Sequence, residues 1–317
     1  MKDLELVYAL YKHGSFSKAA EELYISQSSL SMAIQRIEAE FGTPLFDRHQ
    51  HPVSLTQAGK ELVRYYQEVK PLQRDVRSRI QDIEELRSGS FALGGTHYLL
   101  SYILPETIVH FAQQYPGIEL KIVEAQSGSF KDLLASCQID LCLKCDVSDP
   151  KLQTIAHAFF DRLYLAVPKE QVETLGLAEN AMTGAQIREG SVNAVDYYFR
   201  TEDLEKITFL QLTPGNNLYS RSEEIFRQLG ARPKNTIHFH QFVTAYNLAG
   251  SGLGCTLASS RLISRHDHPG LVYYELPTPL MIRDFHFTIR KDAYISRCMR
   301  AFCALFSEVE SGKKAKG

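Results

Sequence analysis

The 317-residue sequence contains no apolar run long enough to cross a membrane as a helix. Its first residues, MKDLE, lack the cationic and apolar regions of a secretory signal peptide. Six cysteines in a chain of this length do not have the density of a disulfide scaffold. These absences predict a cytoplasmic protein that makes no membrane contact.

An excess of positive charge is also missing. The formal net charge is −2, and residues 1–60 are slightly acidic by count. The overall charge therefore gives no indication of nucleic-acid binding. Any contact with DNA phosphates must come from individual side chains and from helix N-termini. The composition, 44% hydrophobic and 23% charged, is that of an ordinary folded protein with two or three domains.

Local signatures of catalysis and of metal binding are absent too. No set of nucleophile, base and orienting residue appears, so no catalytic residue is assigned. Cys142 and Cys145 have the Cys-x-x-Cys spacing of a metal or redox pair, but on a predicted strand they point to opposite faces, and no second pair follows. The glycine-rich run 250–254 follows a predicted helix, an order that favours a helix-to-strand turn over a phosphate loop. We predict no metal and no cofactor.

The N-terminal residues do contain a pattern of two short helices joined by a tight turn. Ala19, Ala20 and Leu23 share one face of the first helix, and Ser26 is suited to cap the second. The inward positions of the second helix are Leu30, Ala33, Ile34, Ile37 and Phe41. Its other face carries short polar side chains, as a helix needs when its first turns enter the major groove. A small helical bundle without DNA binding is the alternative.

Flanking elements complete an N-terminal domain over residues 1–58. A first amphipathic helix places Leu4, Val7, Tyr8 and Tyr11 on one face and ends at Gly14, and Gly42 ends the helix that follows Ser26. Residues 43–48 and 52–55 are expected to form a two-stranded wing around the polar tip 49–51.

Seven polar residues of this domain are predicted to contact DNA: Gln27, Ser28, Ser29, Ser31, Gln35, Arg36 and Arg48. A glutamine such as Gln27 can read adenine through two hydrogen bonds, and serines suit phosphates or base edges. The alternative for the serines is a solvated surface position. Arg48 lies in the wing, where it is expected to contact the DNA backbone or to pair with a nearby acid.

Residues 59–88 are predicted to form a dimerisation helix. An apolar seam recurs every three or four positions at Leu62, Tyr66, Val69, Val76, Ile80 and Ile83, within a helix expected to run from 56 to about 87. Packing of this seam against its own domain is the alternative. Pro71 is expected to kink or break the helix, and residues 88–90 to form a flexible joint.

Residues 89–310 alternate between predicted strands and helices, which indicates two α/β units with parallel sheets covered by helices on both faces. Strands are expected at 91–93, 119–124, 139–143, 163–167, 207–210, 237–239, 253–257 and 285–289. Helices are expected at 99–111, 130–136, 218–229, 242–249 and 293–310. The polar tail 311–317 is expected to be disordered.

With these residues laid out, the chain resembles the LysR-type transcriptional regulators. The resemblance is densest at residues 14–23 (GSFSKAAEEL), 44–48 (PLFDR) and 55–59 (LTQAG), with Ser26, Gln27, Leu30, Ser31, Ile34, Glu38, Phe41 and Gly42 between them. It continues more weakly at 104–105, 115–116, 139–141, 167–168 and 252–254. Three residues depart from the pattern: Ser28 stands where proline is frequent, Met32 where arginine is frequent, and Pro71 is unusual in the linker helix. Met32 could instead contact a thymine methyl.

The resemblance implies a winged helix-turn-helix, a linker helix and a two-lobed α/β effector domain similar to type II periplasmic binding proteins. It further implies a homodimer or homotetramer on double-stranded promoter DNA, modulated by a small-molecule effector bound between the lobes. RNA polymerase is a further candidate partner. The competing class is a cytoplasmic small-molecule-binding protein or enzyme on the same two-lobed fold.

Three loops that precede predicted helices are the candidate effector site. Their backbone N–H groups, hydroxyls and amides suit a carboxylate or another anion. The candidates are Thr96, His97, Tyr98, Gln126, Ser127, Gly128, Ser129, Asn216 and Asn217. His97 either responds to pH or is an ordinary hydrogen-bonded loop residue. Tyr197, Tyr198, Phe199 and Phe242 are candidate apolar walls, with a place in the core as the alternative.

Overall fold

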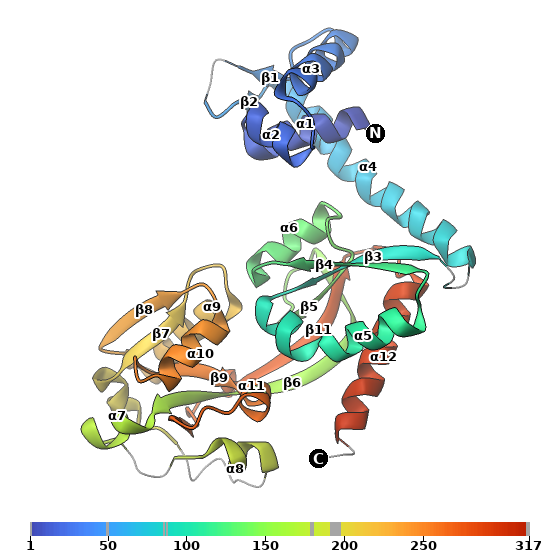
Figure 1. The fold of residues 1–317 in the computed structure, drawn as a ribbon. Coiled ribbons are helices and arrows are strands. Elements are labelled where there is room, and N and C mark those ends of the chain that lie inside the picture. Colours follow the sequence, from blue (N-terminus) through green and yellow to red (C-terminus); the bar gives the residue numbers. More distant parts are fainter. Residues whose placement is uncertain are drawn as a thin grey trace. The chain divides into compact units, whose positions relative to one another are not determined.

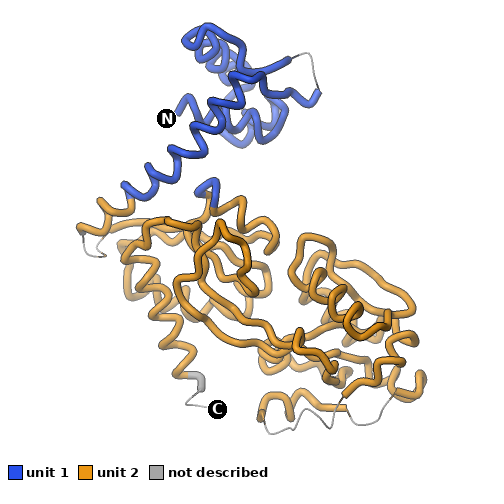
Figure 2. Tube along the Cα trace, turned by 180° about the vertical axis from the view of Figure 1, so that it is seen from behind, with its two compact units in different colours: residues 1–77, 135–137 blue, residues 78–134, 138–317 orange. Residues whose placement is uncertain are grey.

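The computed structural model of the chain describes residues 2–48, 51–84, 86, 88–177, 181–190 and 198–314. It divides into two compact units, residues 1–77 with 135–137 and residues 78–134 with 138–317 (Figure 2). None of the helices in the described ranges combines the length and apolar composition that a membrane span requires.

The first unit begins with three helices, α1 (Lys2–His13), α2 (Phe16–Glu22) and α3 (Gln27–Phe41). The expected apolar faces meet in one core, which includes Val7, Leu10, Ala19, Ala20, Leu30, Ile34 and Ile37. Two expected core residues are wrong: Tyr11 is 45% exposed and Phe41 is 53% exposed. Both lie in the last turn of their helix, beyond the neighbours that cover the rest of the apolar face.

Caps and turns follow the sequence signals closely. Ser26 Oγ accepts the backbone N–H of Ser29 at 3.1 Å, which confirms the predicted N-cap of α3. Gly14 and Gly42 both have positive φ angles, +58° and +65°. A Cβ on Gly14 would also lie only 2.7 Å from the Cβ of Pro52, so the wing approaches this turn at a distance that only glycine permits.

The wing consists of antiparallel strands β1 (Phe46–Asp47) and β2 (Ser54–Leu55), shorter than expected, and residues 49 and 50 of its tip lie outside the described residues. Helix α4 (Gln57–Gln81) then continues through Pro71, so a break there is wrong, whereas the alternative, a kink at Pro71, stays a prediction. A proline φ near −65° is compatible with a helix, and only one backbone hydrogen bond is lost. The helix ends before the expected residue 87, and a 3₁₀ turn follows at Asp82–Glu84.

The apolar seam of α4 divides into two halves. Near the start, Tyr66 is buried and its ring centroid lies 5.0 Å from that of Tyr8, so this half packs on its own unit. Towards the end of α4 and in the 3₁₀ turn after it, the seam residues Val76, Ile80 and Ile83 are between 55% and 77% exposed, and so is Leu72, which was not among the predicted seam residues. The first half therefore packs on its own unit, and dimerisation through the exposed half stays a prediction.

The second unit is built of two lobes joined by strands (Figure 1). Lobe 1 contains β3 (Gly89–Gly95), β4 (Ile118–Glu124), β5 (Leu141–Cys145), β11 (Ile282–Arg290) and the first part of β6 (Leu152–Pro168), with α5 (Pro105–Gln114), α6 (Phe130–Ala135) and α12 (Arg297–Lys314). Lobe 2 contains the rest of β6, β7 (Thr208–Leu212), β8 (Asn235–Phe239), β9 (Thr256–Ser259), β10 (Leu271–Tyr274), α7 (Lys169–Thr174), α8 (Gly184–Glu189), α9 (Asn217–Leu229), α10 (Phe242–Gly250) and α11 (Ser260–Arg265).

The expectation of purely parallel sheets is wrong. The pairs β3–β4, β3–β5 and β7–β8 are parallel, but β11 is antiparallel to β5 and to β6, and β6 is antiparallel to β9 and β10. Strand β6 pairs with β11 through residue 162 and with β9 from residue 163, so it crosses from one lobe to the other (Figure 1). One hydrophobic core continues through both lobes.

Other boundaries also differ from expectation. Several elements were not expected from the sequence: strand β10, helices α7, α8 and α11, and the first half of β6. Strand β9 begins at Thr256 rather than at residue 253. The run 250–254 does form the predicted turn between α10 and β9. Helix α12 continues to Lys314, so residues 311–314 are helical rather than disordered, and residues 315–317 lie outside the described residues.

Candidate functional site

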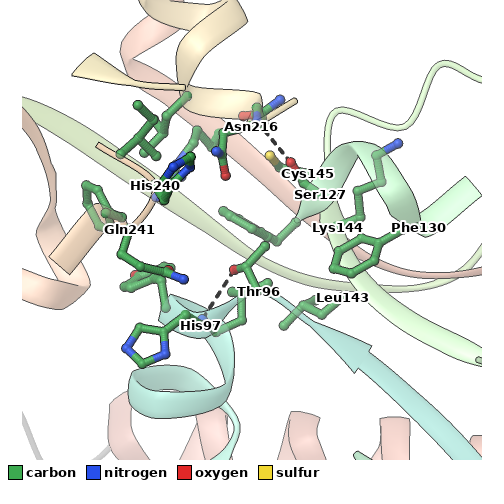
Figure 3. A pocket seen from close by; sticks show the side chains of 18 residues that line it. Thr96, His97, Ser127, Phe130, Leu143, Lys144, Cys145, Asn216, His240 and Gln241 are labelled. Carbon is green, nitrogen blue, oxygen red and sulfur yellow. Dashed lines mark hydrogen bonds between the residues drawn. The ribbon is translucent and has the colours of Figure 1, made fainter. Parts of the chain in front are cut away.

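A pocket lies between the two lobes of the second unit (Figure 3). Its cavity volume is about 60 Å³, room for a few water-sized groups in this conformation and less than the several hundred Å³ of a typical small-molecule site. Thr96, His97 and Ser127 line it from lobe 1, and Asn216, His240 and Gln241 line it from lobe 2. The apolar part of the wall is formed by Leu99, Phe130, Leu143, Leu212, Leu218, Phe242 and Phe285.

Local structure explains why these polar groups face the pocket. Thr96 precedes the π-helical segment η2 (Leu99–Ile103), and its hydroxyl accepts the N–H of Leu99 at 3.5 Å. On the other side, Asn216 and Gln241 are the N-cap residues of α9 and α10, and neither side chain caps its own helix. Two helix N-termini with their partial positive charge thus meet the pocket from lobe 2.

Direct hydrogen bonds join the lobes along one edge of the pocket. Ser127 Oγ accepts the backbone N–H of Asn217 at 2.9 Å, and the N–H of Gly128 donates to the carbonyl of Gly215 at 3.0 Å. A Cβ on Gly128 would lie 2.7 Å from that carbonyl oxygen, so the close approach requires glycine. This edge of the pocket is closed in the structure.

An ion pair strengthens the same edge. Arg221 of α9 donates to the carboxylate of Asp146, which follows β5, and its guanidinium also donates to the carbonyl of Ile282 at 3.1 Å. The Arg221 side chain is only 8% exposed. Asp146 Oδ2 also accepts the side-chain amide of Asn217 at 3.4 Å. Lobe 1 therefore holds both the first residue of α9 and a residue one turn further on.

A second polar network lies beneath the pocket, where the lobes are connected. Arg283 of β11 donates through Nε to Asp161 Oδ2 of β6 at 3.1 Å, and Asp161 Oδ1 accepts the hydroxyl of Ser259 at 2.7 Å. Ser259 Oγ is in turn 2.8 Å from the hydroxyl of Tyr98. Burial lowers the pKa of Arg283, but the Asp161 carboxylate outweighs that effect and raises it, so the guanidinium stays charged. Burial raises the pKa of Tyr98, whose hydroxyl stays neutral.

The charged groups of the pocket wall are of one sign. Lys144 and Arg283 are cationic, and the described lining residues include no aspartate or glutamate. Lys144 comes from β5, where it pairs in register with His286 of β11. His97 and His240 add two titratable side chains; Nδ1 of His97 is 3.3 Å from Glu124 and Nδ1 of His240 is 3.1 Å from the hydroxyl of Thr213.

Seven of the predicted effector residues line this pocket: Thr96, His97, Tyr98, Ser127, Asn216, Asn217 and Phe242. Gln126, Gly128 and Ser129 do not line it, because the 3₁₀ turn Ser127–Ser129 directs Gly128 onto Gly215 and leaves Ser129 exposed. Phe199 lies in the core, 5.3 Å from Tyr274 between ring centroids. Tyr198 is 39% exposed and does not line the pocket, and Tyr197 lies outside the described residues.

Sequence reasoning missed several lining residues. His240 and Gln241 directly precede α10, so the same search for loops before helices finds them once that helix start is considered. Lys144, Cys145, Arg283 and Phe285 lie inside strands, and only the pairing of β5 with β11 brings them to the pocket. No local pattern signals that pairing.

The cysteines form no metal centre in the described part of the chain, where no group of three potential ligands meets. Cys142 packs with Phe130 and Leu134, whereas Cys145 packs in the main core, as expected for strand positions three apart. Burial raises the pKa of each thiol to about 12.

The polar face of α3 is exposed in the first unit. Gln27, Ser28, Ser29, Gln35 and Arg36 are exposed and Ser31 is half-buried. Several also have partners within the unit: Gln27 Oε1 accepts the hydroxyl of Ser17 at 3.0 Å, and Arg36 pairs with Asp3 at 2.5 Å. Met32 on the same helix is 63% exposed.

Arg48 of the wing pairs with an acidic residue, which was the alternative to a contact with the DNA backbone. Its guanidinium donates to Glu38 Oε2 at 2.8 Å and lies 5.4 Å from the ring centroid of Phe16. Glu38 Oε1 accepts the backbone N–H groups of Leu45 and Phe46, so Glu38 ties the wing to α3. A contact of Arg48 with DNA stays a prediction.

Comparison with known proteins agrees with both units. Residues 1–60 match the family described as bacterial regulatory helix-turn-helix protein, lysR family. Residues 84–180 and 194–311 match the LysR substrate binding domain. An uncharacterized HTH-type transcriptional regulator of Bacillus subtilis, YcgK, is 27% identical over 97% of this chain and 94% of its own length. A probable RuBisCO transcriptional regulator of Porphyra purpurea is 24% identical over 95% of this chain and 91% of its own.

Solved structures share the fold. Full-length BenM has a TM-score of 0.57 at 22% identity and covers 99% of this chain and 97% of its own. Full-length CbnR complexed with its target DNA has a TM-score of 0.58 at 16% identity and covers 97% of this chain and 98% of its own. The two matched domains together span most of the sequence, one for binding DNA and one for an effector. The chain belongs to the LysR family of DNA-binding transcriptional regulators, which are not enzymes.

Proposed function

We propose that this regulator reads promoter DNA with the exposed face of α3 and changes its DNA binding when a small organic anion occupies the pocket between its lobes. The observation that carries the proposal is the pocket itself, which has cationic groups and two helix N-termini on its wall and no carboxylate side chain among its described lining residues.

The DNA-reading residues are proposed to be Gln27, Ser28, Ser29, Ser31, Gln35, Arg36 and Arg48. They lie on the polar face of α3, from its first residue to Arg36, and in the wing, and their side chains offer both donors and acceptors to base edges and phosphates. Met32 adds an exposed apolar group on the same helix, which suits a thymine methyl. Because unit 1 is not basic, placed contacts rather than bulk charge supply its affinity.

Self-association is proposed through the second half of α4. Four exposed apolar side chains, Leu72, Val76 and Ile80 of α4 and Ile83 of the 3₁₀ turn after it, are spaced four, four and three residues apart, as in the seam of two packed helices. A homodimer, or a homotetramer formed from two dimers, would present two copies of α3 to DNA. We propose that the protein acts in this form in the cytoplasm, at promoters, with RNA polymerase as the neighbouring partner.

Selection of binding sites from a random DNA pool tests this function directly, because the protein itself picks out the operator sequence. A dimer predicts enrichment of sequences with dyad symmetry, their half-sites one helical turn or a multiple of it apart. Enrichment of no sequence by the full-length protein, with and without mixed organic acids, would refute sequence-specific reading.

A further inference from the structure

A second cavity lies in the first unit, between the start of α1 and the middle of α4. Its volume is about 430 Å³, which is within the size range of small-molecule sites and larger than the 60 Å³ of the pocket between the lobes. The two helices contribute Lys2, Glu5, Lys70, Gln73, Arg74 and Arg77 to its wall. Cys137, from residues 135–137 of the same unit, also lines it.

The wall of this cavity is strongly cationic. Among its described lining residues are two lysines, two arginines and a single acid, Glu5, so positive charges exceed negative ones by three. The unit as a whole does not share this bias, because residues 1–60 are slightly acidic by count. The cations are thus concentrated around the cavity rather than spread over the surface of the unit.

Helical spacing gathers three of these cations on one face of α4. Lys70, Arg74 and Arg77 follow one another at intervals of four and three residues, so their side chains are neighbours on the helix surface. Like charges at these intervals destabilise a helix. An anion bound between the side chains would remove that repulsion.

The positive charges of the wall are accessible and not neutralised. Lys2, Lys70 and Arg77 form no ion pair with any residue that the structure describes. Lys2 and Arg77 are exposed, and Lys70 is half-buried with its Nζ 5.2 Å from the ring centroid of Tyr66. The ring holds this ammonium group in place without neutralising its charge. A ligand can therefore contact all three cations.

The spacing of the cations indicates a ligand with more than one anionic group. Lys70 and Arg77 are seven residues apart, which is about 10 Å along the helix axis. Two or three linked phosphate groups can contact cations at that separation, and each phosphate suits the planar fork of an arginine. An anion with three or four negative charges also matches the excess of three positive charges on the wall.

We propose that this cavity binds a small polyphosphate anion of the size of inorganic pyrophosphate or triphosphate. The site is separate from the pocket between the lobes and does not depend on the proposed effector role of that pocket. The ligand would join α1 to α4 and so stabilise the first unit. Asp3, the residue after Lys2, pairs with Arg36 of α3 at 2.5 Å, so the ligand would bind next to a contact of the proposed DNA-reading face.

Calorimetry of the full-length protein with inorganic pyrophosphate, at constant ionic strength and without divalent cations, tests the proposal. One pyrophosphate is expected to bind per chain, at least about tenfold more tightly than orthophosphate, because it matches more of the cationic groups. Citrate, which carries its charge on carboxylates, is expected to bind more weakly than pyrophosphate. Pyrophosphate should also raise the Tm of the protein.

Two variants locate the bound anion. Lys2→Gln on α1 and Arg77→Gln on α4 each remove one exposed cation from the wall and are each expected to weaken pyrophosphate binding at least about tenfold. Lys60→Gln removes the same charge from an exposed position of α4 that does not line the cavity, and it should leave the affinity nearly unchanged. Circular dichroism checks that all three variants are folded.

Each other outcome would overturn the proposal. Absence of pyrophosphate binding at millimolar concentration would remove the site, and equal weakening by Lys60→Gln would show an interaction with general surface charge. Tighter binding of citrate would contradict the phosphate assignment. If pyrophosphate does not bind but Arg77→Gln lowers the affinity for all DNA sequences and its salt dependence, the cations contact the DNA backbone instead. Sequence-specific reading and the effector pocket have their own assays and would stand in every case.

Discussion

Ser127 of lobe 1 and Asn217 of lobe 2 are joined by a hydrogen bond of 2.9 Å from the backbone N–H of Asn217 to the Ser127 hydroxyl. This N–H belongs to the first residue of α9, where no partner exists within the helix. Asn216, the N-cap residue, does not cap α9 with its own side chain. The cap of α9 is thus supplied by lobe 1. A movement of the lobes apart would remove this cap and so lower the stability of α9.

Removal of the Ser127 hydroxyl should lower the stability of the protein by as much as the loss of a helix cap does. Ser127→Ala is expected to reduce the free energy of unfolding by about 1 kcal/mol, measured by urea denaturation of the full-length protein. Ser129→Ala removes a hydroxyl from an exposed residue of the same turn and should change stability little. Equal losses in both variants would contradict a cap from lobe 1.

The ion pair of Asp146 with Arg221 should be worth more than a surface pair. Asp146→Ala leaves a guanidinium that is 8% exposed without its counter-charge, but Asp146 itself is 37% exposed and partly screened by solvent, so a loss of about 1–3 kcal/mol is expected. Asp149→Ala removes the partner of Lys131, whose side chain is 42% exposed, and should cost no more than about 1 kcal/mol. The difference between the two midpoints in urea is the measurement, and similar midpoints would show that solvent screens the Arg221 pair.

A charged side chain introduced into the exposed apolar seam should dissociate the oligomer into single chains. Ile80 is 61% exposed in the single chain, and its burial against a second helix would contribute about 1.5–3 kcal/mol per copy. Ile80→Glu is therefore expected to weaken self-association at least tenfold in sedimentation velocity. Gln67→Glu adds the same charge at an exposed position of α4 away from the seam and should not. Unchanged association of Ile80→Glu would place the interface elsewhere.

The buried cysteines should be unreactive in the folded protein. Burial raises the pKa of Cys142, Cys145 and Cys303 to about 12, so almost no thiolate forms at about pH 8, and reactivity appears only as the pH approaches that value. Alkylation by iodoacetamide, followed by mass spectrometry, should label these positions slowly until urea unfolds the chain. Fast labelling, or a disulfide between Cys142 and Cys145 on mild oxidation, would revive the redox interpretation.

The first side chain of α3 should contribute to sequence discrimination. Gln27→Ala is expected to reduce the difference in binding free energy between selected and random DNA by about 1–3 kcal/mol at fixed salt. Gln113→Ala, at an exposed position of α5, is the control and should leave that difference unchanged. An unchanged specificity ratio for Gln27→Ala would remove this residue from the reading face.

The sequence predicted best what is decided locally. Ser26 as a cap, the glycines at 14 and 42, and the buried face of α3 follow from short-range rules, and all are present. Helix ends were less predictable: Tyr11 and Phe41 follow the helical period but lie where nothing covers them. Pro71 shows that one unfavourable residue does not end a helix that is otherwise favourable over 25 residues.

Contacts between distant segments were beyond local rules. The antiparallel pairing of β11 with β6 joins residues more than a hundred positions apart, and it alone brings Arg283 to Asp161. Half of the pocket could be predicted because helix starts are visible in the sequence, as at Thr96 and Asn217. The other half, including Lys144 and Arg283, depends on strand register that no neighbouring residues specify.

The most direct test of the central claim is a titration of full-length protein with DNA from just upstream of its own gene and with a random duplex. Fluorescence anisotropy at two salt concentrations gives both affinities. A sequence-specific regulator predicts binding to the upstream DNA at least a thousandfold tighter, with affinity for both duplexes falling as salt rises. Equal weak binding to both duplexes, with the organic acids present or absent, and for residues 1–88 as well as the whole chain, would contradict the account.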